Sequence, residues 1–134
     1  MINKNVSVGF GLVYVLVGVV GFFLTGFRGF ASPTGPLLFG FMINPLHNLV
    51  HVLVGAVLIA GGLAAVGVSK LVNTVVGAVY LLVFAVGLAL QGSTANVLAL
   101  NVADHGLHLV SAVLLVSIGV AADRSTTPPA YLRR

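Results

Sequence analysis

The chain of 134 residues contains no cysteine and only two acidic residues. Without cysteine it can form no disulfide, thiolate metal site, thiol nucleophile or c-type haem attachment. Charged residues make up 6% of the chain, whereas a soluble domain carries roughly 25%. Because 59% of the residues are hydrophobic, water could not solvate most of this chain. The scarcity of charge therefore predicts an integral membrane protein.

Basic residues outnumber acidic ones by six to two, which gives a net charge of +4. In a soluble protein this excess would raise the question of nucleic-acid binding. Here the basic residues stand at the ends of apolar segments and form no stripe interleaved with aromatic residues. Charges in such places set membrane topology and contact anionic lipid. We therefore expect the lipid bilayer as a partner and no nucleic acid.

Four long apolar segments account for most of the chain, and a membrane-spanning helix needs roughly 20 such residues. We predict helices over about residues 6–25, 44–68, 71–91 and 101–122. The fold class expected is all-α, a four-helix transmembrane bundle forming one domain over residues 1–122.

The connections between these helices differ in length. Residues 26–43 form a long loop with several glycine and proline breakers, and residues 92–100 form a short, uncharged loop. Between the second and third helices we expect a tight turn around residues 67–70. Residues 123–134, which contain two adjacent prolines, are predicted to be a disordered cytoplasmic tail.

The orientation in the membrane follows from the basic residues. On one side of the predicted bundle lie Lys4, Lys70, Arg124, Arg133 and Arg134. On the opposite side there is only Arg28. Because cytoplasmic segments carry the excess of lysine and arginine, we expect both termini to be cytoplasmic.

Two halves of the sequence resemble each other. The pattern Gly-x-x-Tyr occupies residues 11–14 and returns at residues 77–80. Likewise Asn-x-x-His-x-x-x-His at residues 44–51 corresponds to Asn-x-x-Asp-x-x-x-His at residues 101–108. We interpret the chain as two tandem copies of a helical hairpin, related by an axis along the membrane normal.

The same motifs contain good helix starts. Asn44 precedes Pro45, and asparagine caps the free amides of a helix whose first position favours proline. Asn101 occupies the matching position, and a carboxylate three residues later, Asp104, can reach back to the cap. Capping is therefore the role expected of Asn44 and Asn101.

Histidines in these helices form a candidate site. Residues four apart share one helix face, so His47 projects with His51, and Asp104 projects with His108. His51 and His108 stand seven residues past their caps, roughly 10 Å into the helix. Ionisable groups at such depth face a bundle interior or a cavity. His105 points about 100° away and is the weakest candidate among these residues.

Several interpretations of this cluster remain open. The histidines could bond one another, Asn48, backbone or water, and so join the two hairpins. His47, His51, Asp104 and His108 could bind a divalent metal such as zinc. Alternatively, His51 and His108 could be the axial ligands of haem b. A site for a proton or a small ligand is a further alternative.

Catalytic signatures are lacking. The sequence has no glycine-rich phosphate loop, no Ser-His-Asp arrangement and no pair of acids within the spans, so we assign no catalytic residue. We expect a non-enzymatic or accessory protein of the cell envelope, in a homo-oligomer or a larger membrane complex. The alternatives are a metal- or haem-binding redox protein and an oligomeric small transporter or channel. The apolar inner halves of all four helices count against transport.

Two segments carry a family resemblance. Asn-Pro-Leu-His-Asn-Leu-Val-His at residues 44–51 and Ala-Asp-His-Gly-Leu-His-Leu at residues 103–109 resemble an uncharacterised family of small four-helix membrane proteins, domain of unknown function 4383. That family occurs chiefly in actinobacteria. The resemblance implies the four-helix fold and a bacterial plasma membrane location, and it implies no activity or catalytic residue.

Overall fold

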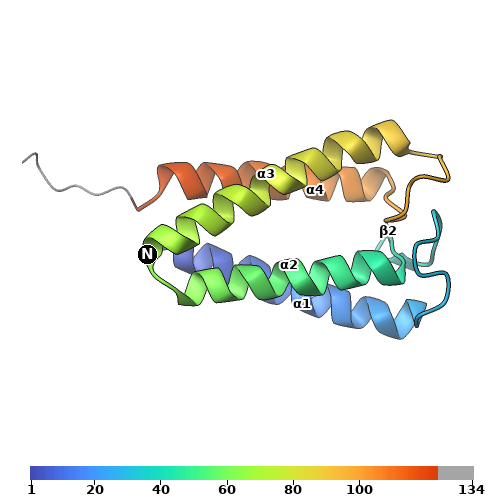
Figure 1. The fold of residues 1–134 in the computed structure, drawn as a ribbon, viewed down its shortest axis with the longest axis horizontal. Helices are drawn as coiled ribbons and strands as arrows, with labels where there is room; N and C mark the ends of the chain where they lie inside the picture. Colours follow the sequence, from blue (N-terminus) through green and yellow to red (C-terminus); the bar gives the residue numbers. More distant parts are fainter. Residues whose placement is uncertain (124–134) are drawn as a thin grey trace, which may run out of the picture.

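The computed structural model describes residues 1–123, so the predicted tail lies outside the described residues except for Asp123. The elements are α1 (Ile2–Thr25), β1 (Leu37–Leu38), β2 (Phe41–Met42), α2 (Pro45–Leu63), α3 (Val66–Leu90) and α4 (Val102–Ala121). Helices α1 and α2 pack as one hairpin, and α3 and α4 as the other (Figure 1). The expectation of an all-α bundle made of two helical hairpins is confirmed.

All four helices are long and apolar enough to cross a membrane. Their outward faces carry large hydrophobic side chains, for example Leu16 and Phe23, which are 63% and 85% exposed. Such faces suit contact with lipid. We call the end that holds Ile2 and Ala121 the terminal end, and the opposite end, which holds the first and third connections, the loop end (Figure 1).

Within each hairpin, glycines bring the helix backbones into direct contact. A Cβ atom added to Gly11 would lie 2.7 Å from the carbonyl oxygen of Gly55, and one added to Gly55 would lie 2.7 Å from that of Gly11. In the second hairpin, a Cβ atom on Gly77 would lie 2.8 Å from the backbone nitrogen of Val116. Small residues of this kind permit close packing of membrane helices.

The turn between α2 and α3 is displaced from the predicted one. Helix α2 ends at Leu63 and α3 begins at Val66, so the residues expected to form the turn, 67–70, lie in the first part of α3. The reason is a hydrogen bond that hydropathy cannot show: the Ser69 hydroxyl donates to the carbonyl of Gly61 at 2.7 Å. The same carbonyl also accepts the backbone amide of Ala64 at 3.3 Å, so Ser69 adds a second bond to a carbonyl at the end of α2.

The long connection at the loop end contains a small β-hairpin. Leu37 pairs with Met42, and Leu38 pairs with Phe41. The two residues between the strands both have positive φ, 52° at Phe39 and 92° at Gly40, as a tight primed turn requires. This hairpin was not predicted from the sequence.

The terminal end contains a buried polar cluster made of Asn3, Ser7, Ser69 and Asn73, each 0% exposed. The Asn73 amide donates to the backbone and side-chain oxygens of Asn3, at 3.0 Å each, and the Ser7 hydroxyl donates to the carbonyl of Leu58 at 2.7 Å. The expectation that the inner halves of the helices are apolar is therefore wrong. A few inward polar residues hardly change the average hydropathy of a span.

Asp123 closes the terminal end of the bundle. Its carboxylate accepts hydrogen bonds from the backbone amides of Ile2 at 3.1 Å and Asn3 at 2.8 Å, which α1 itself leaves without partners. The Lys70 ammonium donates to the carbonyl of Ala122 at 2.9 Å. The hydrogen bond from the Asn3 amide is the main reason that the pKa of Asp123 lies below its ordinary value.

Candidate metal-binding site

The site begins at the two helix starts of the loop end. The Asn44 side chain accepts a hydrogen bond from the backbone amide of His47 at 2.8 Å. At the start of α4, Asn101 and Asp104 form a reciprocal capping box: the Asp104 amide donates to the Asn101 side chain at 3.1 Å, and the Asn101 amide donates to the Asp104 carboxylate at 2.9 Å. Both asparagines thus fix where their helices begin, and with them the position of the histidines that follow.

Asn44 also fastens the loops above the site. Its amide nitrogen donates to the carbonyl of Ser32 and to the carbonyl of Val97, at 2.7 Å each. These acceptors belong to the first and third connections. The Asn101 amide donates in the same manner to the carbonyl of Gly40 in the β-hairpin, at 2.9 Å. The loop end is therefore closed by side-chain bonds from both capping residues.

Beneath this cover, three histidines converge from α2 and α4. His47, His51 and His108 are 2–3% exposed, and one nitrogen from each lies within 4.8 Å of the others. The Nε2 atoms of His47 and His51 are 3.2 Å apart. The ring centroid of His108 lies 6.0 Å from that of His47 and 6.4 Å from that of His51.

Two tyrosines pack against these rings. Between ring centroids, Tyr14 of α1 lies 5.4 Å from His51, and Tyr80 of α3 lies 5.3 Å from His108. The two tyrosine rings meet edge to face, with their centroids 5.3 Å apart. Both tyrosine hydroxyls, and Nδ1 of each of the three histidines, are buried without a hydrogen-bond partner among residues 1–123. So many unpaired polar atoms around one place are rare in folded proteins, which makes this place a candidate for binding an ion or water.

No direct hydrogen bond joins His51 to His108 in the described part of the chain. His51 bonds to His47 of its own helix, whereas its contact with His108 is between ring faces and edges. Asn48 donates to the Thr25 hydroxyl at 2.9 Å, which links α2 to α1 inside one hairpin. The role of His51 and His108 in joining the hairpins through backbone or water therefore stays a prediction.

Two neighbouring polar residues lie outside the group of three. The Asp104 carboxylate is used by the capping box, although Asp104 and His51 line the same small cavity. His105 packs on the other side of α4, where its ring centroid lies 6.4 Å from that of Phe84. It also lies close to Gly87: a Cβ atom added to Gly87 would be 3.1 Å from Nδ1 of His105. Of the four predicted metal ligands, the structure brings together three and leaves Asp104 beside them.

Haem fits this arrangement poorly. Axial ligation by His51 and His108 requires a flat porphyrin between their rings, but Nε2 of His47 lies 3.2 Å from Nε2 of His51 and takes up that space. The cavity next to His51 measures about 70 Å³, whereas pockets for sizeable ligands measure about 300–1,000 Å³. The described residues thus provide no slot for a macrocycle between the two histidines.

A single metal ion fits better. Imidazole nitrogens bound to zinc at about 2.0–2.1 Å in a tetrahedron lie about 3.3 Å from one another. The 3.2 Å separation in the His47–His51 pair already has this value. The third nitrogen, from His108, lies within 4.8 Å and would have to move by at most about 1.5 Å. Three imidazoles leave one tetrahedral position open.

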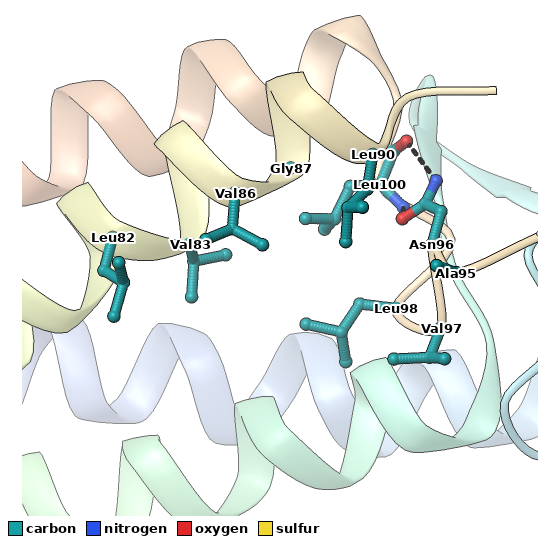
Figure 2. A pocket seen from close by; sticks show the side chains of 10 residues that line it. All are labelled: Leu82, Val83, Val86, Gly87, Leu90, Ala95, Asn96, Val97, Leu98 and Leu100. Atoms are coloured by element: carbon teal, nitrogen blue, oxygen red, sulfur yellow. Dashed lines mark hydrogen bonds between the residues drawn. The ribbon is translucent and has the colours of Figure 1, made fainter. Parts of the chain in front are cut away.

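A larger pocket elsewhere is lined almost wholly by aliphatic side chains. It measures about 240 Å³ and lies between α3 and the third connection, where Val83, Val86 and Leu98 contribute aliphatic side chains (Figure 2). Its polar residue, Asn96, uses its amide group to bond the backbone of Leu100 (Figure 2). The three-histidine group is therefore the better candidate for a functional site.

The family model described as a domain of unknown function, DUF4383, matches residues 4–121. The chain belongs to this family. The match covers α2, α3 and α4 and all but the first two residues of α1, and it includes the three histidines of the DUF4383 chain. Neither the curated proteins nor the solved structures give a match.

Proposed function

We propose that this DUF4383 chain is a non-enzymatic membrane protein that binds a divalent transition metal through His47, His51 and His108. The observation that carries the proposal is the convergence of three buried imidazoles whose ligand atoms lie within 4.8 Å of one another. Neutral imidazole is a ligand that zinc, copper and nickel all accept. The identity of the metal is left to measurement.

Asp104 lies next to the three histidines and supplies negative charge there. A divalent ion in a membrane interior needs compensating charge, and Asp104 is one of only two acidic residues in the chain. It lies on α4 one turn from His108 and shares a cavity wall with His51. Carboxylates next to metal-bound histidines orient the rings and raise their basicity. We assign Asp104 to this supporting role instead of direct ligation.

The proposed site joins the two hairpins, because two of its ligands come from α2 and one from α4. We infer that the hairpins are tandem copies. Matching contacts support this: Gly21 packs on Asn48 of α2 as Gly87 packs on His105 of α4. The cluster lies at the interface between these copies, which is a common place for a shared site.

For the location we propose a bacterial plasma membrane with both termini in the cytoplasm. The distribution of lysine and arginine supports this orientation, which places the three histidines in the outer half of the bilayer. A metal would then reach the site from the outer face. On its way it would pass the loops that Asn44 and Asn101 hold in place.

The test is metal analysis of the protein purified in mild detergent and incubated with zinc, copper or cobalt. We expect about one ion per chain, and we expect His51→Gln or His108→Gln to lower the affinity at least tenfold. His105→Gln is the matched control, since it removes a buried histidine of α4 that lies outside the group. Thermal unfolding without metal, measured for each variant, shows whether it has remained folded.

Two results would contradict the proposal. One is a folded wild-type protein that binds none of the three metals. The other is binding that His105→Gln weakens as much as His51→Gln does, because the metal would then be held at some unrelated place. If only stability changes in the His51 and His108 variants, the histidines are packing residues.

A further inference from the structure

A small enclosed cavity adjoins the three-histidine group. It measures about 70 Å³ and is lined by Val17 of α1, by Leu107 and Asp104 of α4, by His51 of α2, and by the first connection. Leu38, Phe39, Phe41 and Ile43 form its cover from that connection. The cavity therefore occupies the space between the β-hairpin and the helices, directly beside one of the proposed metal ligands.

The surface of this cavity is almost wholly apolar, even though two ionisable residues contribute to it. A water molecule needs two to four polar partners to remain in such a place, whereas an apolar cavity of about 150 Å³ stays dry and accepts benzene or xenon. At about half that volume, the cavity suits species no larger than xenon or a diatomic gas. Charged or strongly hydrogen-bonding ligands are disfavoured.

Small uncharged molecules also have a route to this place. They partition from water into apolar surroundings, and the outward faces of the bundle are built for lipid. At the cover of the cavity, Phe39 is 91% exposed and belongs to a turn with positive φ. The cavity is thus separated from the surroundings by a short hairpin and not by a packed helix.

We propose that this cavity binds a small uncharged molecule of diatomic size, such as dioxygen or nitric oxide, and holds it next to the open position of the three-histidine metal. Binding in the cavity depends on its shape alone, whereas contact with a metal rests on the proposed function above. The two parts can therefore be tested separately.

The first test uses xenon as a probe of the purified protein, detected by xenon NMR in detergent. The variant Val17→Phe fills the cavity from α1, and Val13→Phe is its control, because Val13 lies one turn away on the same helix and is 57% exposed. We expect Val17→Phe to weaken xenon binding at least tenfold and Val13→Phe to leave it unchanged. Equal binding in all three proteins, or none in the wild type, overturns the proposal.

The second test uses cobalt(II)-loaded protein and nitric oxide, followed by the visible spectrum of cobalt. We expect nitric oxide to change the spectrum of the wild type and of Val13→Phe, and to lose most of this effect in Val17→Phe while cobalt remains bound. Cobalt binding with equal nitric oxide response in both variants refutes delivery from the cavity. Failure to bind cobalt refutes the metal site and the delivery, while xenon still decides whether the cavity takes a ligand.

Discussion

The contact between α1 and α2 at Gly11 allows a sharp test of how the first hairpin is held together. A methyl group at Gly11 would lie 2.7 Å from the Gly55 carbonyl oxygen and 2.9 Å from the backbone nitrogen of Ile59. Both obstacles are backbone atoms, so no side-chain rotation can remove them. Gly9, two residues earlier on the same helix, has nothing within 4 Å of the corresponding position.

Gly11→Ala should therefore force the helices apart, whereas Gly9→Ala should not. Ordinary contacts with a Cβ atom begin at 3.4 Å, so the two helices must separate by about 0.7 Å. A gap of this size forfeits about a quarter to a half of the dispersion attraction at the affected contacts. Overpacking of this kind costs about 1–3 kcal/mol. Both variants gain the same helix propensity, about 1 kcal/mol in water, so their difference isolates the packing cost.

The measurement is reversible unfolding in mixed micelles, followed by helical circular dichroism. We expect Gly11→Ala to be less stable than Gly9→Ala by about 1–3 kcal/mol. Equal stabilities for the two variants would show that the helices are not in backbone contact at Gly11, and the close hairpin described above would be wrong.

Two further predictions concern the ends of the bundle. Because the Asn3 and Ile2 amides lower the pKa of Asp123, its contribution to stability is present above the ordinary carboxyl value of 3.8 and is lost as the pH falls below it. A pH series of unfolding midpoints should show this loss, and Asp123→Asn should remove it; an unchanged pH profile refutes the interaction. Asn44→Ala should destabilise the protein by about 0.5–2 kcal/mol through its cap alone and speed proteolysis of residues 26–43. Equal proteolysis rates would contradict the closure.

The general fold could be predicted from composition, because long apolar segments without charge leave few alternatives to membrane helices. The helix starts at Asn44 and Asn101 could also be predicted, since capping depends on residues close together in the sequence. The rule that residues four apart share a face also anticipated that His47 and His51 would project together. These features are all local.

What the sequence could not show depends on contacts between distant segments. Asn73 looks like a minor interruption of an apolar span, yet its amide reaches Asn3, 70 residues away. Hydropathy places Ser69 in a turn, whereas its hydroxyl bonds back to α2 and lets α3 begin earlier. The separation of Asp104 from the three histidines likewise follows from its capping bond, which competes with any other use of the carboxylate.

The bonds at the terminal end have a consequence for how the chain is made. Helix α1 is synthesised first, but the amides of Ile2 and Asn3 acquire the Asp123 carboxylate only after α4 has been synthesised. The Asn3 side chain similarly waits for Asn73. During synthesis water must therefore hydrate these groups of α1 until α3 and α4 arrive, so the terminal end of the bundle takes its final form only when the last helix is in place.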